Sequence, residues 1–360
     1  MNKEQRGYVL SILIFTYLLV IIGVVMNFSI SPASQNGALS LTLFYRYLIS
    51  IGVGSAVMFV FANINHKIFR KAAFPFLIFL FILLFFTKSS PNTSSNRWIY
   101  TGTPFSFQPS QYVSLALIIF TAKIFSGKVK EENFKKYYIF LIIVMLVLVA
   151  QVGMEPDLGS AFIIFLTMLF LLFGIGMDMK LFFEFIGFVS FAGYLFVRHS
   201  KSWYGRIVAF LHPEKFAQSG SYQAMQSFRA IARGGISGVG FMKSYFKYGS
   251  LPENGADFIF AIIGEELGLI GETVVLLLFA FLGYIGFRIS RAVSDPYSRI
   301  IALGITLNLI VGAVVNISTN IGLLPVTGVP LPIVSYSGNN IIATFASLGI
   351  LINIVKEEMR

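Results

Sequence analysis

The sequence contains no cysteine and few charged residues. Without cysteine, disulfide bonds, thiolate metal sites and a thiol nucleophile are all excluded. The three histidines, His66, His199 and His212, are scattered and form no metal-binding spacing. Charged residues make up 12% of the 360 residues, which is about half of the share found in soluble domains. A soluble enzyme or binding module is therefore not predicted.

Long apolar stretches take the place of these charges. Hydrophobic residues make up 56% of the chain, including 39 phenylalanines, and the mean hydropathy is +0.79. Segments that cross a bilayer must satisfy their backbone hydrogen bonds internally, as helices do. We therefore expect an all-α polytopic membrane protein that forms a single domain over residues 1–360. About ten transmembrane helices are predicted, near 8–30, 41–62, 73–87, 109–125, 137–153, 158–176, 181–198, 257–287, 298–321 and 337–355.

Lysine and arginine predict the orientation of these spans. Basic residues are enriched in cytoplasmic connections, and their alternation along this chain places both termini in the cytoplasm. The exception is residues 199–256, a basic connection that is nevertheless expected to be a large extracytoplasmic loop. Long loops can escape the charge rule, or this loop presents a basic surface to an anionic, phosphate-bearing lipid. The candidate residues for such a surface are Arg206, Arg233, Lys243 and Lys247.

Acidic residues gather in LPENGADFIFAIIGEELG (251–268), which holds four of the 16 in the chain. Asp257 is expected at the outer end of a span, where it could cap the helix or act chemically. Glu265 and Glu266 follow within the span, where a carboxylate needs a partner or a function. Arg46, alone in another span, or main-chain groups are the expected partners. Because 257–287 is too long for one straight crossing, a tilt, a break or a protruding end is also predicted.

Two further stretches are expected at the outer face. Asp157 follows a proline in EPDLGSA (155–161), a pattern typical of a turn followed by a helix cap. The uncharged stretch 322–340 contains Pro325, Pro330 and Pro332. It cannot form a regular helix, so we expect it to line a cavity or to be buried in protein.

Five separate stretches resemble the SEDS family (shape, elongation, division and sporulation), the multi-spanning peptidoglycan glycosyltransferases. They are RWI…FQPS (97–110), EPDLGSA (155–161), YQAMQSFRAIARGGISGVG (222–240), LPE…DFIFAIIGEELG (251–268) and GLLPVTGVPLPIVSYSG (322–338). Their order and spacing extend the resemblance over nearly the whole chain. A few positions, among them 232–235, resemble the cell-division branch more than the elongation branch.

The resemblance implies an enzyme that polymerises lipid II into glycan strands at the outer face of the bacterial cytoplasmic (inner) membrane, during cell division or elongation. Asp257 is then the expected catalytic base. The expected substrate-binding residues are Arg97, Asp157, Arg206, Arg233, Lys243, Lys247 and Glu253. The residues expected to shape the cavity are Arg46, Glu265, Glu266, Pro325, Pro330 and Pro332.

The resemblance also implies partners. Family members work with a single-span class B penicillin-binding transpeptidase, and other division or elongation membrane proteins are expected nearby. No nucleic-acid partner is predicted, because the sequence contains no nucleic-acid-binding module. A nucleotide-binding loop is not predicted either, because the glycines at 234–240 lack the strand and the Lys-Ser/Thr of a phosphate-binding loop. No specific cofactor is predicted: the departing pyrophosphate is expected to be assisted either by a divalent cation (Mg²⁺ or Mn²⁺) or by the basic residues of the loop.

The chain departs from the family pattern at several positions. Gln111 and Ser114 stand where the family usually has Glu and Lys, so that a charged pair is lost. Gly255-Ala256 replaces His-Thr, and Ser337–Asn340 replaces Gly-Gly-Ser-Ser. Two alternatives are therefore kept open: a flippase for lipid-linked precursors, and a non-catalytic scaffold of the division machinery.

Overall fold

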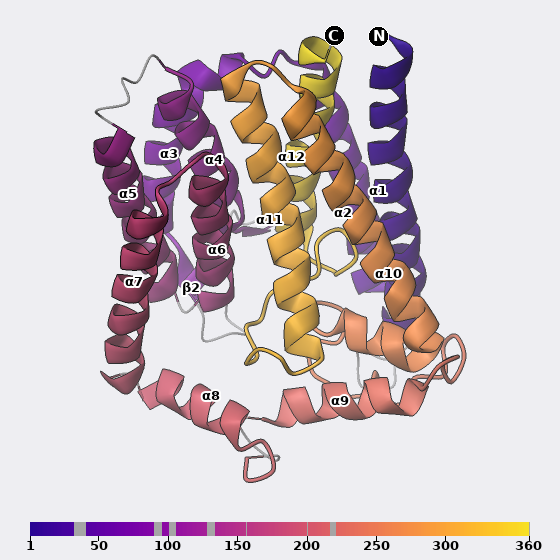
Figure 1. Cartoon of the computed structure of the whole chain (residues 1–360). Coiled ribbons are helices and arrows are strands. Elements are labelled where there is room, and N and C mark those ends of the chain that lie inside the picture. The colour runs from indigo at the N-terminus through magenta and orange to yellow at the C-terminus, as the bar shows by residue number, and fades with distance from the viewer. Residues whose placement is uncertain are drawn as a thin grey trace.

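A computed structural model of the chain describes residues 1–31, 41–89, 96–100, 106–127, 134–155, 157–199, 201–216 and 221–359. Within these residues, helices α1–α7 and α10–α12 run side by side, and α8 and α9 lie across one end of the bundle (Figure 1). The predicted all-α polytopic architecture is confirmed. The helices are α1 (Lys3–Ile30), α2 (Thr42–Asn63), α3 (Ile68–Leu84), α4 (Ser110–Phe125), α5 (Phe134–Met154), α6 (Leu158–Gly174), α7 (Met179–His199), α8 (Lys201–Leu211), α9 (Tyr222–Gly234), α10 (Ile259–Ala292), α11 (Pro296–Asn320) and α12 (Gly338–Glu358).

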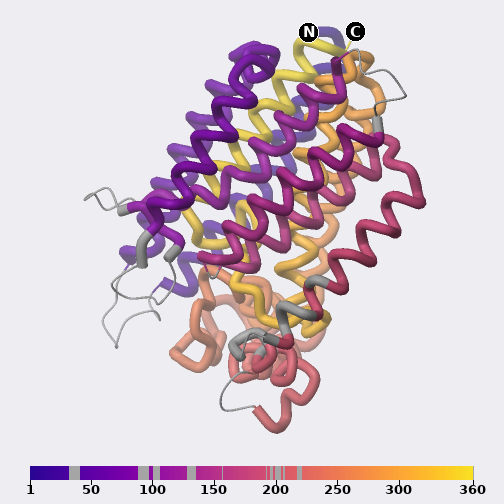
Figure 2. Tube along the Cα trace, turned by 90° about the vertical axis from the view of Figure 1, so that its left-hand side faces the viewer, coloured from indigo at the N-terminus to yellow at the C-terminus, as the bar shows by residue number. Residues whose placement is uncertain are grey.

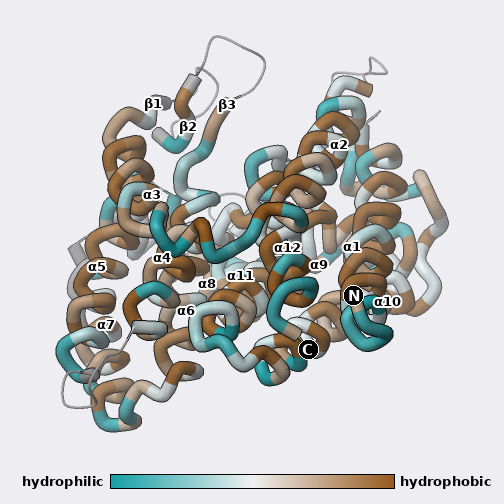
Figure 3. Tube along the Cα trace, turned by 90° about the horizontal axis from the view of Figure 1, so that it is seen from above, coloured by the Kyte–Doolittle hydropathy of each residue, from teal (hydrophilic) through white to brown (hydrophobic). Residues whose placement is uncertain are grey.

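The two ends of the bundle differ in what they carry. Both termini lie at one end, and the connection between α7 and α10 covers the opposite end (Figures 1 and 2). Seen from the end that carries the termini, the helices are mostly hydrophobic and the hydrophilic segments are concentrated in the connections (Figure 3). In the described part of the chain, α1, α2, α5, α10, α11 and α12 are long and apolar enough to cross a membrane, and α4 and α6 are apolar but shorter.

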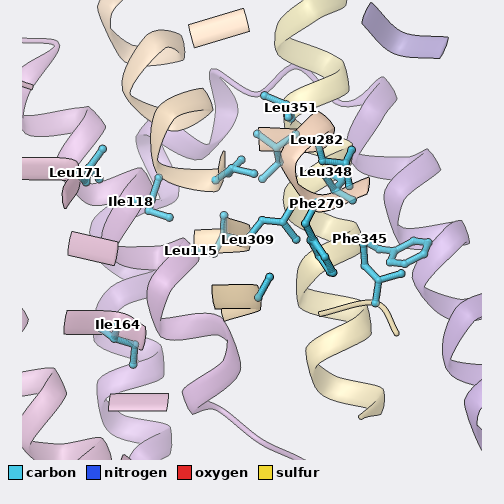
Figure 4. Packing of buried hydrophobic residues seen from close by; sticks show 14 of the residues in the cluster. Leu115, Ile118, Ile164, Leu171, Phe279, Leu282, Leu309, Phe345, Leu348 and Leu351 are labelled. Carbon is cyan, nitrogen blue, oxygen red and sulfur yellow. The ribbon is translucent and has the colours of Figure 1, made fainter. Parts of the chain in front are cut away.

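The core of the bundle lies around α12, which packs along α2 and also contacts α1, α4 and α11. Side chains from α4, α6, α10, α11 and α12 meet there (Figure 4). Leu309 of α11 lies between Leu115 of α4 and Phe279 of α10 in this view. Close packing of these helices fixes the positions of the connections at the end opposite the termini relative to one another.

A small sheet was not predicted from the sequence. Strands β1 (Lys88–Ser89), β2 (Asn96–Tyr100) and β3 (Ser106–Phe107) form an antiparallel sheet in the order β1-β2-β3. It lies between α3 and α4, at the end opposite the termini (Figure 1). Strand β2 carries Arg97.

Helix α10 is broken, as its length predicts. Gly268 has φ 69° and ψ −167°, so two helices meet there at a sharp turn. The first runs across the end of the bundle opposite the termini, and the second rises through the bundle (Figure 1). Residues 235–240 bind the backbone groups that the break frees. Leu269 N–H donates to the carbonyl of Gly235 at 2.9 Å, and Val239 N–H donates to the carbonyl of Glu265 at 2.9 Å.

The proline-rich stretch between α11 and α12 is irregular and largely buried, as predicted. Its carbonyls accept hydrogen bonds from side chains of the spanning helices. Tyr47 Oη donates to Ile333 O at 2.8 Å, and Asn27 Nδ2 donates to Val334 O at 3.0 Å. Irregular backbone is tolerated inside a membrane protein only where such partners exist.

We expect Gly268→Ala to destabilise the protein. The backbone angles of Gly268 are essentially restricted to glycine and cost another residue about 1–3 kcal/mol. A Cβ atom there would also overlap the backbone of Ile236 and Gly238. The melting temperature of the purified protein in detergent should therefore fall. The control is Gly187→Ala, at an exposed position of α7 where a Cβ atom meets nothing within 4 Å. It should leave the melting temperature unchanged. Equal changes in melting temperature for both substitutions would show that the break does not require glycine at position 268.

Candidate functional site

Asp257 lies on a tight turn directly before α10. Glu253, at φ 54°, begins this turn, and its carbonyl accepts the N–H groups of Ala256 and Asp257 at 3.1 and 3.0 Å. The N-cap of α10 is Phe258, and it makes no side-chain cap bond. Asp257 is thus not the helix cap, and that explanation of the residue was wrong. Its carboxylate makes no hydrogen bond to the described residues and stays available.

The surroundings of Asp257 tune its acidity. A Cβ atom built on Gly328 would lie 3.5 Å from Asp257 Oδ2, so the carboxylate faces the proline-rich stretch across a narrow gap. Burial and the charges of Glu253 and Asp157 raise the pKa of Asp257 to about 7, while Arg97 opposes this shift. A carboxylate with a pKa near the working pH is suited to accept a proton.

Arg97 and Asp157 form the neighbouring part of the site. Asp157 is buried, and its Oδ2 accepts hydrogen bonds from Gln108 Nε2 and Ser110 Oγ, both at 2.9 Å. Its Oδ1 caps α6 through Ser160 N–H and lies 3.8 Å from Arg97 Nη1. The predicted cap is confirmed. Because its oxygens are already engaged, Asp157 holds Arg97 near Asp257 and does not present a free carboxylate.

Glu265 and Glu266 are buried and bind the loop that follows α9. Glu265 pairs with Arg233 and accepts hydrogen bonds from the Ser244 hydroxyl and from Tyr245 N–H, the latter at 2.8 Å. The expected pairing with Arg46 is wrong, whereas the expected pairing with main-chain groups is confirmed, because Tyr245 N–H donates to Glu265 and Met242 N–H to Glu266. Arg46 lies on an exposed face of α2, because depth along a span does not determine which way a side chain points around the helix.

Lys247 is the second cation of this cluster. Its ammonium lies 2.9 Å from Glu266 Oε1 and also donates to Ser29 Oγ at 2.9 Å and Met242 O at 2.8 Å. Both side chains of the ion pair are 0% exposed. Lys247 is therefore not free to bind an outside anion, and its expected role in substrate binding is corrected to a structural one.

The remaining cations of the loop differ in accessibility. Arg233 keeps 44% of its side chain exposed although it pairs with Glu265. Lys243 is exposed. Arg206 lies in α8, and its side chain is outside the described part of the structure. Of the residues expected to bind substrate in this loop, Arg233 and Lys243 are accessible in the described structure. Lys215 and Arg229 of the same loop are exposed as well.

A cavity opens behind the proline-rich stretch, between α4, α6, α11 and α12. Pro330 and Pro332 line it, whereas Pro325 does not. The described residues around it carry no charge. The polar ones are Ser110, Gln111, Ser114, Ser160, Asn308, Asn340, Thr344 and Ser347.

Two of the departures from the family pattern meet in this cavity. Asn340 Nδ2 donates to Gln111 Oε1 at 2.9 Å, and Gln111 Nε2 donates to Ser160 Oγ at 3.2 Å. Asn340 Oδ1 is buried and has no partner among the described residues. Gln111, which stands where the family usually has Glu, thus takes part in a neutral amide bridge.

Known protein sequences are similar to this chain over nearly its whole length. Residues 9–360 match the sequence model of FtsW/RodA/SpoVE cell cycle proteins. The chain belongs to this family. Stage V sporulation protein E of Bacillus subtilis is 32% identical over 362 residues, covering 98% of each chain. A B. subtilis protein named probable peptidoglycan glycosyltransferase FtsW is 31% identical over 379 residues, covering 98% of this chain and 92% of that one.

Solved structures of other family members share the fold. A chain from a structure titled "Structural coordination of polymerization and crosslinking by a peptidoglycan synthase complex" aligns with a TM-score of 0.80 and 22% identity, covering 96% of this chain and 97% of that one. The rod shape determining protein RodA of Thermus thermophilus aligns with a TM-score of 0.70 and 22% identity, covering 97% of both chains. These likenesses establish the architecture of a multi-pass membrane protein.

The sequence did not single out Glu155 as a site residue. It is buried beside Asp157, and Thr87 Oγ1 donates to its Oε1 at 3.0 Å. Burial and the charge of Asp157 raise the pKa of Glu155 to about 8, although Thr87 and Arg97 oppose this. Only its nearness to Asp157 in the chain could have indicated such coupling. At neutral pH this family member therefore holds a mostly protonated acid next to the Arg97–Asp157 pair.

A metal centre is not preformed around Asp257. Among the described residues, one group of three has ligand atoms within 4.8 Å of one another, namely His66, Asp295 and Glu358, near the end that carries the termini. Both ring nitrogens of His66 are engaged, with Asn353 Oδ1 at 2.8 Å and Ser298 Oγ at 2.7 Å. We read this group as a polar network that joins α11 and α12 to the α2–α3 connection.

We expect Lys247→Met to destabilise the fold, because it leaves the charge of Glu266 buried without a partner. Breaking a buried ion pair on one side costs about 3–5 kcal/mol. The double variant Lys247→Met/Glu266→Gln removes both charges and should melt at a higher temperature than Lys247→Met alone. Thermal unfolding in detergent measures both. If Lys247→Met melted like the wild type and only raised the substrate concentration required, Lys247 would be an anion-binding residue after all.

Proposed function

We propose that this protein is a peptidoglycan glycosyltransferase that polymerises lipid II at the outer face of the bacterial cytoplasmic membrane. The observation that carries the proposal is the free carboxylate of Asp257, held near Arg97 with a pKa of about 7. The relatives named peptidoglycan glycosyltransferase FtsW support the same reaction.

In the proposed reaction the ionised Asp257 takes the proton from the 4-hydroxyl of one disaccharide. The hydroxyl oxygen then attacks the anomeric carbon of a second disaccharide, and polyprenyl pyrophosphate leaves. An α-linked donor thereby gives a β-1,4 bond with inversion. Positioned proton acceptance of this kind contributes about 10²–10⁴-fold to a rate.

The leaving pyrophosphate needs positive charge nearby. Arg97, Arg233 and Lys243 are the residues we assign to it, because their side chains are at least partly accessible. Arg206 is proposed on its position in α8 alone. Glu253 acts indirectly, since its charge raises the pKa of Asp257.

A divalent cation fits the donor set only in part. Asp257 offers one free carboxylate, whereas the oxygens of Asp157 are taken by Gln108, Ser110, Ser160 and Arg97. Mg²⁺ is often bound by one or two carboxylates together with substrate phosphates. Asp257 serves as the base in the proposed reaction, and a bound cation would lower its pKa. We therefore propose that the basic residues, and not such an ion, supply the charge to the pyrophosphate.

We further propose that the chain acts in the division branch with a class B penicillin-binding transpeptidase. Most of the relatives compared are named FtsW, and the aligned complex couples polymerization with crosslinking by its title. A flippase is less well supported, because the described lining of the membrane cavity lacks the cations that an anionic pyrophosphate would require.

We expect Asp257→Asn to abolish most polymerisation while the protein stays folded. Asn cannot accept the proton, so the initial rate should fall about 10²–10⁴-fold. The helix start should survive, because the cap of α10 does not depend on the Asp257 side chain. Polymer formed from lipid II, per amount of folded protein, measures the effect. If Asp257→Asn gave as much polymer as the wild type, another residue would have to be the base, and the proposal would be refuted.

The pH dependence provides a second measurement on the same residue. A base works ionised, so the wild-type rate should rise about tenfold per pH unit below 7 and level off above it. Glu253→Gln removes a charge that raises the pKa of Asp257, and should move this acidic limb to lower pH. A limb that stays in place would show that another group titrates.

The proposed orientation places α9 outside and both termini in the cytoplasm. Because the chain has no cysteine, single cysteines can be labelled without background. Ala232→Cys, exposed on α9, should react with an impermeant thiol reagent in intact spheroplasts. Ala292→Cys, exposed at the other end of α10, should react only after permeabilisation. The reverse pattern would invert the topology.

A further inference from the structure

Two buried asparagines of α11 lie directly behind the turn that carries Asp257. Asn316 and Asn320 are one helical turn apart and are 1% and 0% exposed. Asn316 Nδ2 donates to the carbonyl of Asp257 at 2.8 Å, and Asn320 Nδ2 donates to the same carbonyl at 3.0 Å. Two amide groups thus converge on the backbone of one residue.

Each asparagine has a second attachment. Asn316 Nδ2 also donates to the carbonyl of Val329 at 2.7 Å. Val329 follows Gly328, which faces the Asp257 carboxylate. Asn316 therefore ties together the two sides of the gap in which that carboxylate lies.

Asn320 fixes the start of α10. Its Oδ1 accepts the N–H of Ala261 at 3.1 Å, and its Nδ2 donates to Asn316 O at 2.9 Å. The first N–H groups of a helix lack the usual partners within the helix, and the N-cap Phe258 supplies no side-chain cap. Its carbonyl also accepts the Ala261 N–H at 3.1 Å, so that Asn320 shares this donor. Asn320 provides from a neighbouring helix what a local cap would otherwise supply.

We propose that Asn316 and Asn320 are positioning residues for Asp257. They set the place of its main chain, and hence the distance of the carboxylate from Gly328 and from the substrate hydroxyl. The proposal rests on the proposed function, in which Asp257 is the base. A displacement of about 1 Å of a reacting group can cost about 10²-fold in rate, so an indirect contact of this kind is sufficient to control turnover.

Asn316→Leu tests the proposal, since Leu is of similar size and donates no hydrogen bond. We expect kcat to fall about 10- to 100-fold and KM for lipid II to stay within about threefold. The matched control is Thr306→Val on the same helix. Thr306 is buried, and its hydroxyl donates only within the helix, to Ala302 O at 2.7 Å. The control should keep the wild-type kcat per folded molecule.

A double variant separates positioning from general stability. If Asn316 acts through Asp257, adding Asn316→Leu to Asp257→Asn should cause no further loss of the residual rate. If Asn316 only supports the fold, the two losses should multiply. The acidic limb of the pH profile should also shift in Asn316→Leu, which a merely smaller amount of folded protein would not produce.

Each result is decisive. A wild-type kcat for Asn316→Leu, or losses that multiply with Asp257→Asn, would overturn the positioning role. If Asn316→Leu fails to fold, Asn316→Ser, which keeps one donor, takes its place in the same cycle. Full activity of the single variant Asp257→Asn would instead refute the proposed function. This variant therefore distinguishes a failure of the proposed function from a failure of the positioning role of Asn316.

Discussion

The end of the bundle opposite the termini is held in place by hydrogen bonds around Gly268, where α10 breaks. A broken helix at membrane depth frees N–H and C=O groups that lipid cannot satisfy. Residues 235–240 bind these groups through main-chain hydrogen bonds. The loop after α9 can therefore occupy only one position relative to α10. The turn at 253–258 connects this loop to α10. The location of Asp257 therefore depends on the main-chain hydrogen bonds between residues 235–240 and α10.

The carboxylates of one short stretch have divided roles. Glu265 and Glu266 are saturated by Arg233, Lys247 and groups of the loop, so they organise the protein and present little to a ligand. Asp257 is left without a hydrogen bond among the described residues, and its pKa is raised. Burial of charge costs stability unless it is paired, which explains why Glu265 and Glu266, at 0% and 1% exposed, both have partners of opposite charge.

Much of the architecture was predictable because the length of an apolar run determines whether it can cross a membrane. The break in α10 followed from the same count, and the cap formed by Asp157 followed from local sequence. Main-chain partners of Glu265 and Glu266 were expected, but the cations that pair with them were not predictable, because the loop that supplies them takes its shape from contacts distant in sequence. The importance of Asn316 was hidden for a related reason. An amide within an apolar helix matches no motif until the carbonyls around it are known.

The bridge between Gln111 and Asn340 has a consequence for energised membranes. A unit charge moved across the bilayer couples to the membrane potential by about 2.3 kcal/mol per 100 mV. The amide bridge carries no net charge, and neither do the other described residues that line its cavity. Movement of these uncharged side chains during turnover would not couple to the membrane potential. A collapse of the proton-motive force should therefore not affect the protein through this cavity.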